Sequence, residues 1–178
     1  MKVEIDNYTI IIKPLLIYAD KLDRVCIENI LKNIRTKYTH IFINPHRVLD
    51  HRQVIYSIVQ SIKNRSIGIE IARKIELDIL GYICCTDQIK NIVEKCIEDY
   101  NGKLLLISYC MNCNEEDLLR EQYNILDNIS KLCDTSIVDL AICFSCYKIV
   151  KLSEYCNDVS DVMDFMEKIV EMLLRRVE

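Results

Sequence analysis

Hydrophobic and polar residues follow one another along the chain in blocks that predict both strands and helices. Residues 3–12 alternate and then become a β-branched run, which predicts a strand that Pro14 interrupts. Residues 39–44 (THIFIN) and 103–110 (KLLLISYC) are short apolar runs of the kind that form buried strands. The apolar run within residues 137–152 suits a buried strand at least as well as a helix.

Between these runs, apolar residues recur with helical spacing. The pattern predicts helices at residues 20–38, 54–62, 71–80, 89–100, 115–133 and 159–174. Asp50 can cap the second of them, with Gln53 in the capping-box position. Thr86 and Asn114 are suited to cap the fourth and fifth. The pattern predicts a mixed α/β fold, with a small central β-sheet flanked by several α-helices, in a single domain spanning residues 1–178.

The composition is that of a folded protein without a strong excess of either charge. Hydrophobic residues make up 51% of the chain and charged residues 28%, with 23 basic against 27 acidic residues. Overall charge therefore does not favour nucleic acid or an anionic membrane, although a local basic patch is compatible with it. No stretch approaches the roughly 20 apolar residues of a membrane span, and the N-terminus lacks a signal-peptide core. We expect a cytoplasmic protein without membrane contact.

Glycine is scarce, which limits the kinds of site that the chain can form. Loops that cradle phosphate need clustered glycines, because the backbone must approach the phosphate closely. Gly68, Gly81 and Gly102 are isolated from one another. This excludes a dinucleotide site or a P-loop of the usual kind. We expect a protein that binds partners, not an enzyme, and we expect no cofactor.

The middle of the chain carries a series of short motifs in a fixed order. They read Ile43-Asn44-Pro45, Asp50-His51-Arg52-Gln53-Val54, Leu77-Asp78-Ile79-Leu80-Gly81-Tyr82 and Thr86-Asp87-Gln88-Ile89-Lys90. In the order, spacing and helix lengths of these motifs, residues 39–108 resemble the kinase-binding regulatory subunit of the KEOPS complex (the PRPK-binding protein, or TPRKB-like, family). The resemblance fades beyond residue 112.

The resemblance implies a non-catalytic subunit of a complex that makes threonylcarbamoyl-adenosine on tRNA. Such a subunit docks on a small atypical kinase-like ATPase, and archaeal members of the family also grip the single-stranded 3′ CCA end of the tRNA. The expected partners are therefore this kinase/ATPase subunit and tRNA. The residues expected to contact tRNA are Arg73, Lys74, Gln88 and Lys90. Asp87 stands where the family has an arginine thought to face tRNA, and a carboxylate repels phosphate.

Basic residues are concentrated in the segment that carries the resemblance. They are Arg47, Arg52, Lys63, Arg65, Arg73, Lys74 and Lys90. A patch for tRNA phosphates and a merely solvated face are both consistent with this concentration. Tyr56 and Tyr82 are the aromatic residues of the segment that could stack on unpaired bases.

Ten cysteines support a second hypothesis, a zinc-binding or disulfide redox domain. Cys110 with Cys113 and Cys143 with Cys146 form two C-x-x-C pairs, a spacing at which thiolates share a tetrahedral zinc ion. The first pair lies between a predicted strand and a predicted helix, as a redox pair would. The second lies in an apolar run, where two small hydrophobic residues are the simpler interpretation. Structural disulfides are the third option, although they are unusual in the cytosol outside hyperthermophiles.

The remaining cysteines and histidines call for no special chemistry. Cys26 and Cys96 fall on apolar helix faces and are expected to be core residues. His40, His46 and His51 lie around the Asn44-Pro45 turn and are expected to be isolated surface residues. A third hypothesis, an assembly scaffold without RNA contact, is open beside the other two.

Overall fold

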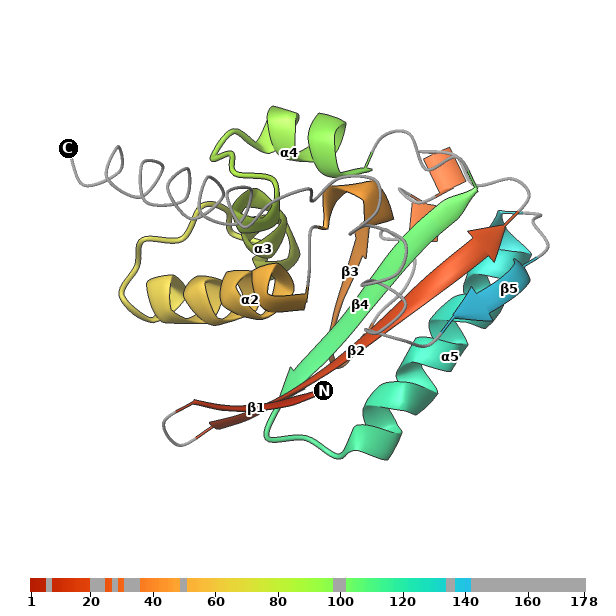
Figure 1. The fold of residues 1–178 in the computed structure, drawn as a ribbon, viewed down its shortest axis with the longest axis horizontal. Coiled ribbons are helices and arrows are strands. Elements are labelled where there is room, and N and C mark those ends of the chain that lie inside the picture. The colour runs from red at the N-terminus through yellow and green to blue at the C-terminus, as the bar shows by residue number, and fades with distance from the viewer. Residues whose placement is uncertain are drawn as a thin grey trace. The chain divides into compact units, whose positions relative to one another are not determined.

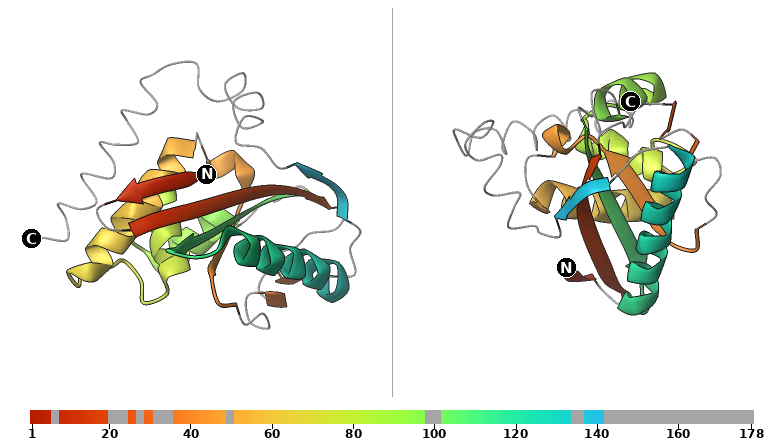
Figure 2. Two further views of the ribbon diagram at one scale, coloured as in Figure 1. Left: turned by 90° about the horizontal axis from the view of Figure 1, so that it is seen from below. Right: turned by 90° about the vertical axis from the view of Figure 1, so that its right-hand side faces the viewer.

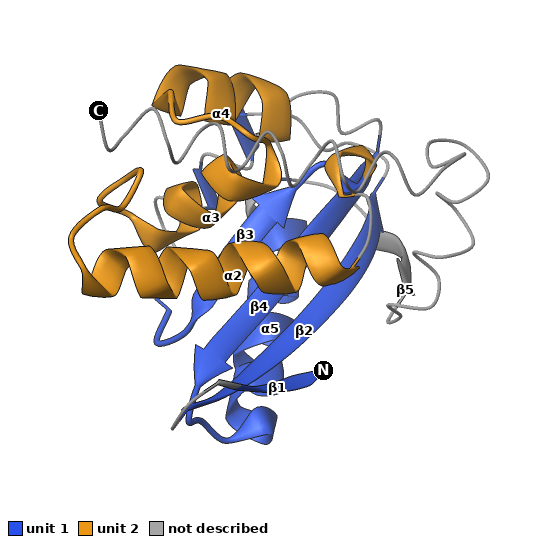
Figure 3. Ribbon diagram, turned by 60° about the vertical axis from the view of Figure 1, so that its left-hand side comes forward, with its two compact units in different colours: residues 1–45, 99–143 blue, residues 46–98, 144–178 orange. Residues whose placement is uncertain are grey.

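The chain combines an antiparallel β-sheet with α-helices, which confirms the mixed α/β class expected from the sequence (Figure 1). The computed structural model describes residues 1–5, 8–19, 25–26, 29–30, 36–48, 51–97, 102–133 and 137–141. The chain divides into two compact units, residues 1–45 with 99–143 and residues 46–98 with 144–178 (Figure 3). The single domain expected for residues 1–178 stays a prediction.

The first unit is built on a sheet that has five strands among the described residues. They are β1 (Lys2–Ile5), β2 (Tyr8–Ala19), β3 (Thr39–Ile43), β4 (Lys103–Met111) and β5 (Ile137–Ala141). The strand order is β1-β2-β4-β3, with β5 also pairing with β2, and all pairs are antiparallel. Residues 104–110 of β4 are buried without interruption, as expected for a central strand whose two faces are both covered.

The expected interruption of the first strand at Pro14 is wrong, because Pro14 lies inside β2 opposite Ile107 of β4. On its other edge β2 pairs with β1 up to Ile11 and with β5 from Leu16 onward. The amide of Ile12 donates toward the β1 side, and Pro14, two residues on, has its nitrogen on the same side. The missing N–H of proline therefore falls between the two partner strands, where neither needs a donor.

Helix α5 (Glu115–Leu132) lies against one face of this sheet (Figure 2). Its start is the one expected, since the side chain of Asn114 accepts a hydrogen bond of 2.8 Å from the amide of Glu116. Leu118 of the helix is fully buried in a cluster with Ile11 and Cys110 of the sheet. These contacts hold the first turn of α5 against the start of β2 and the end of β4.

The described part of the second unit is helical. It contains α2 (His51–Ser66), α3 (Ile75–Ile83) and α4 (Ile89–Ile97), and a 3₁₀ turn, η1 (Pro45–Arg47), precedes them. This order confirms the predicted turn at Asn44-Pro45 and the helices predicted around residues 54–62 and 89–100. The helix predicted for residues 71–80 begins only at Ile75, because residues 71–74 form a loop. The expected cap, Asp50, lies outside the described residues.

The buried face of α2 is more polar than the predicted apolar stripe. Its buried residues are Gln53, Val54, Ser57, Ile58, Ser61 and Asn64. Ile55, Val59 and Ile62, which we expected in the core, are only partly buried. The reason is that α2 packs on α3, whose polar groups bind this face: Ser61 donates to Asp78, and Asn64 to the Tyr82 hydroxyl.

Three further expectations concern segments that are described only in part. Residues 25–26 and 29–30 are helical, within the helix predicted for 20–38, and residues 36–38 are not helical. The ambiguous segment 137–152 is a strand at residues 137–141. The helix predicted for 159–174 lies outside the described residues. None of the described helices combines the length and apolar content that a bilayer crossing requires.

Candidate nucleic-acid-binding surface

The loop between α2 and α3 is held from two sides by groups of opposite charge. The carboxylate of Asp78, a fully buried residue, accepts hydrogen bonds from the amides of Ile71 and Ala72. The guanidinium of Arg65 donates to the carbonyl oxygens of Ala72, at 2.7 Å, and of Arg73, at 2.9 Å. The Arg65 guanidinium also lies 3.9 Å from the Asp78 carboxylate, measured from Nη2 to Oδ2. The backbone that carries Arg73 is therefore fixed through both its amides and its carbonyls.

This arrangement separates the basic residues of the segment by their roles. Arg65 holds the loop and is partly buried, so its role is structural and not that of a surface cation. Arg73 and Lys74 lie on the same loop with exposed side chains. Lys74 is the N-cap residue of α3, where the helix dipole disfavours a cation. Lys74 therefore does not stabilise the helix through its charge.

The loop and the start of α4 pack against the same residue of α3. A Cβ atom added at Gly81 would lie 3.0 Å from Ile71 Cδ1, 3.2 Å from Ile92 Cδ1 and 2.9 Å from the carbonyl oxygen of Thr86. Ile71 precedes Arg73 by two residues, and Ile92 follows Lys90 by two. The absence of a side chain at Gly81 thus lets both cation-bearing segments anchor at one point of α3.

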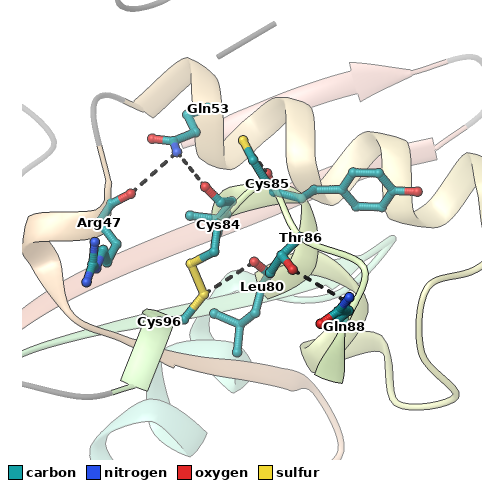
Figure 4. Close-up of a disulfide and its surroundings, with 10 residues drawn as sticks. Arg47, Gln53, Leu80, Cys84, Cys85, Thr86, Gln88 and Cys96 are labelled. Atoms are coloured by element: carbon teal, nitrogen blue, oxygen red, sulfur yellow. Dashed lines mark hydrogen bonds between the residues drawn. A yellow bond between two sulfur atoms is a disulfide. The ribbon is translucent and has the colours of Figure 1, made fainter. Parts of the chain in front are cut away.

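The turn from α3 into α4 closes with a regular helix-ending pattern (Figure 4). The amide of Thr86 donates to the carbonyl of Gly81, at 3.0 Å, and that of Cys85 to the carbonyl of Tyr82. Cys85 takes the left-handed conformation, with φ of 50°, where helices usually place glycine. The Thr86 hydroxyl then accepts from the amide of Gln88 at 3.4 Å. The expectation that Thr86 caps α4 is wrong, because the helix begins at Ile89 and the carbonyl of Gln88 accepts its first hydrogen bond, from the amide of Ile92.

Gln88 and Lys90 are exposed on this turn and on the first turn of α4. The carbonyl oxygen of the Gln88 side chain accepts from Asn91, at 2.9 Å. The Lys90 ammonium lies 3.7 Å from the carboxylate of Glu94, a pair between exposed side chains that contributes little and opens easily. Asp87 is exposed beside them, so the turn presents a carboxylate together with the cation.

The segment that carries these residues is locally basic. Residues 46–97 contain eight Lys and Arg against six Asp and Glu, whereas the whole chain has 23 against 27. Arg73, Lys74, Gln88 and Lys90, which sequence reasoning selected, are all exposed. The structure thus places the four predicted contact residues on two turns, each at the N-terminal end of a helix, where free amides also favour anions.

The two aromatic residues expected to stack on bases are less exposed than the four predicted contact residues. Tyr82 is fully buried, and its hydroxyl accepts a hydrogen bond from Asn64, so the expectation that it stacks on RNA is wrong. Tyr56 is partly exposed, and burial raises the pKa of its phenol. Tyr56 is therefore the aromatic candidate that the described part of the segment retains.

Sulfur–sulfur bonds join six of the described cysteines. The pairs are Cys26 with Cys133, Cys84 with Cys96, and Cys110 with Cys113. Cys26 and Cys96 are buried as expected, but they are disulfide-bonded and not simple core residues. Of the alternative zinc ligands, Cys110 and Cys113 bond to each other, and Cys143 and Cys146 lie outside the described residues. No group of three potential metal ligands occurs in the part of the chain that is described.

A polar array in the first unit has the composition of a catalytic triad. His40 Nδ1 lies 2.8 Å from Ser108 Oγ, and His40 Nε2 lies 3.0 Å from Glu121 Oε1. The expectation that His40 is a surface residue is therefore wrong, since it is 5% exposed. Ser108 is fully buried between β2 and β3, where no substrate reaches its hydroxyl. We interpret this array as a structural link between β3, β4 and α5.

No protein-family model matches the chain, and no curated protein matches it.

Proposed function

We propose that the protein is a non-catalytic subunit of the KEOPS tRNA threonylcarbamoyl-adenosine complex. In this role it binds the atypical kinase/ATPase subunit and the 3′ CCA end of tRNA in the cytoplasm. It acts by binding energy, since holding tRNA in register raises the effective concentration of the substrate at the catalytic subunit. The proposal rests first on the motif order in residues 39–108.

The structural observation that supports tRNA binding is the pair of turns that anchor at Gly81. They present Arg73, Lys74, Gln88 and Lys90 to solvent within the basic segment of an otherwise acidic chain. Lysine and arginine neutralise phosphates, and a glutamine amide offers both a donor and an acceptor to an unpaired base. An extended single strand is a suitable ligand, because its bases and its phosphates are both accessible.

Electrophoretic mobility shifts with intact tRNA and with tRNA lacking its CCA end test the tRNA role. We expect the intact tRNA to bind more tightly, and the difference to shrink in Arg73→Gln/Lys74→Gln. The matched control is Lys2→Gln/Lys131→Gln, which removes the same charge from exposed positions of the first unit. Binding that is indifferent to the CCA end, or equal loss in both variants, would contradict CCA recognition by this surface.

The kinase-docking role needs a separate measurement, since it does not depend on RNA. Co-purification of the chain with a kinase/ATPase subunit of KEOPS, after nuclease treatment, is the direct test. We expect a stoichiometric complex that persists in the Arg73→Gln/Lys74→Gln variant. If no complex forms while the two proteins are each folded, the assembly role is excluded.

A second candidate function, thiol–disulfide exchange, is favoured by the bond between Cys110 and Cys113. This C-x-x-C pair lies between the end of β4 and the cap of α5, the position that the sequence indicated for a redox pair. Disulfide-coupled reduction of insulin, compared between the wild type and Cys110→Ser, tests it. Equal rates in the two proteins exclude this candidate.

A further inference from the structure

A disulfide joins the end of α3 to the last turn of α4 (Figure 4), and its two cysteines differ in exposure. Cys96 is fully buried, whereas Cys84, the C-cap residue of α3, is partly exposed. Thiol–disulfide exchange begins with attack of a thiolate on one of the two sulfurs, so access decides which one reacts. Cys84 is therefore the cysteine at which we expect a thiolate from solution to attack.

The fold also has a place for the thiol of Cys96 when the disulfide is open. Cys96 Sγ lies 3.4 Å from the carbonyl oxygen of Leu80 (Figure 4). That oxygen already accepts from the amide of Cys84, at 2.9 Å, but a carbonyl has two lone pairs and can accept a second donor. The buried thiol therefore finds a hydrogen-bond acceptor without a change of backbone, so both oxidation states are compatible with α3.

The disulfide matters for α4 because this helix has few other attachments to the part of the chain that is described. Among the side chains described in α4, Ile92 and Cys96 are the buried ones, and Ile89 is 52% exposed. A helix of nine residues does not persist in water by itself. With the covalent link removed, Ile92 and the contact of the Cys96 thiol with Leu80 hold the helix. The last turn of α4, where Cys96 lies, is then expected to lose order first. Because helix formation is cooperative and α4 has only nine residues, the loosening is expected to reach its first turn, where Lys90 lies.

We propose that Cys84–Cys96 is a thiol–disulfide exchange site whose oxidation state sets the order of α4 and, through it, the affinity for the CCA end of tRNA. The oxidised form holds the binding turn, and the reduced form releases it. The effect on α4 stands on the disulfide alone, whereas the effect on affinity rests on the proposed function.

The exchange partner is a small thiol or a protein dithiol. Its thiolate bonds to the Cys84 sulfur as the Cys84–Cys96 bond breaks, and Cys96 leaves as a thiolate that takes a proton from water. A second thiolate of the partner then attacks the partner's own sulfur in the mixed disulfide, and Cys84 leaves and is protonated in the same way. One disulfide is reduced and one is formed, with two electrons transferred. An oxidised partner drives the reverse reaction.

Hydrogen exchange of the α4 amides, read by mass spectrometry, tests the conformational step without RNA. The samples are the oxidised wild type, the wild type after mild reduction with its open cysteines mapped by alkylation, and Cys84→Ser, in which this disulfide cannot form. We expect α4 to exchange roughly tenfold faster in the last two samples, while β4 of the first unit is unchanged in Cys84→Ser. The control Cys85→Ser should respond to reduction as the wild type does.

Binding of the same samples to CCA-ended tRNA then tests the regulatory step. Roughly tenfold weaker binding by Cys84→Ser than by oxidised Cys85→Ser supports the proposal. Equal exchange of α4 in the oxidised and reduced wild type overturns it. The proposal is also overturned if the α4 amides exchange faster after reduction while the oxidised and reduced proteins bind tRNA with the same affinity. If α4 loosens but even the oxidised protein binds no tRNA, the proposed function fails and the redox control of α4 stands.

Discussion

At the scale of single residues, both candidate binding turns pack against Gly81, and this packing is possible because glycine has no Cβ atom. Gly81→Ala would gain about 1 kcal/mol from helix propensity. The added Cβ would lie 2.9 Å from the backbone oxygen of Thr86, which cannot move without shifting the turn. We expect the clash to exceed the gain, with a net loss of about 1–3 kcal/mol in the free energy of unfolding.

Chemical denaturation measures this loss, and Lys95→Ala, at an exposed position of α4, is the control for a helix substitution without a clash. Binding of CCA-ended tRNA should also weaken in Gly81→Ala. A Gly81→Ala protein as stable as the wild type would show that the turn yields at no cost, and would remove the packing argument for the site.

At Cys85, in contrast to Gly81, we expect a substitution to raise the free energy of unfolding. Its left-handed backbone, with φ of 50°, costs a residue with a side chain about 1 kcal/mol relative to glycine. Cys85→Gly should therefore raise the free energy of unfolding by about 0.5–1 kcal/mol, whereas Cys85→Ala keeps the strained backbone and should not. Thermal melting of the two variants decides. A glycine variant less stable than the wild type would mean that contacts of the cysteine side chain outweigh the strain.

The roles of individual residues were predictable only where they depend on near neighbours in the sequence. Asn114 caps the helix that follows it, as predicted, because a cap binds an amide two residues away. Thr86 binds the amide of Gln88 but lies two residues before the N-cap position of α4, which begins at Ile89. The burial of His40 was missed, because its partners Ser108 and Glu121 lie 68 and 81 residues away. No local pattern distinguishes such a histidine from one on the surface.

At the scale of elements, the loop between α2 and α3 depends on the buried charge of Asp78. Asp78→Ala removes the acceptor of two loop amides and leaves the partly buried Arg65 without this carboxylate, so we expect a loss of about 3 kcal/mol in the free energy of unfolding. The double variant with Arg65→Ala should lose less than the sum of the single losses, because each single change strands the other charge.

Urea denaturation of the four proteins in this cycle measures the coupling, and Glu76→Ala, in the same turn of α3, is the control. Additive losses would show that Arg65 and Asp78 hold the loop independently. In either case the loop should exchange its amides faster in the Asp78 variant, since two of them lose their acceptor.

The start of α5 supplies a prediction about pH. Lys13 on β2 forms a hydrogen-bonded ion pair with Glu115, and this pair lowers the pKa of the Glu115 carboxyl below its usual value. A carboxyl whose pKa is lower in the folded than in the unfolded state adds stability above the unfolded value, about 4.3. That stability is lost as the pH falls through the lower pKa of the folded state.

The melting temperature of Glu115→Gln should therefore lie below that of the wild type near pH 7, and the two should become equal in acid. A gap that stays constant down to pH 2 would contradict this assignment.

The elements themselves were largely predictable, because hydrophobic periodicity and caps are local signals. The departures have long-range causes. Pro14 is tolerated in β2 because two different strands share one edge, which residues 3–12 cannot reveal. The polar buried face of α2 is explained by its partners on α3. Similarly, the pairing of the cysteines depends on which helix ends meet, and spacing indicated only the Cys110–Cys113 pair.

At the scale of the whole molecule, the question is how a chain with a net charge of −4 would bind an anionic partner. Attraction has to come from the basic segment against the repulsion of the remainder, so affinity should be moderate and strongly dependent on salt. Three neutralised phosphates, one each for Arg73, Lys74 and Lys90, correspond to a slope of about −2 in log K against log salt concentration on a single strand. Asp87 works against this attraction, because it places a carboxylate on the candidate binding turn before α4.

Asp87→Arg should therefore raise the affinity for CCA-ended tRNA by roughly tenfold at low salt, and should make the salt slope steeper by about 0.7, the contribution of one more phosphate contact. The matched control is Glu4→Arg, which makes the same change of charge at an exposed position on β1 of the first unit. Titrations of both variants at several salt concentrations distinguish a local contact from a general change of charge. If Glu4→Arg gains as much as Asp87→Arg, the protein responds to net charge alone and the turn before α4 is not the binding surface. If Asp87→Arg alone gains, and tRNA lacking its CCA end shows no such gain, the arginine contacts the tail, and the wild-type aspartate limits its affinity.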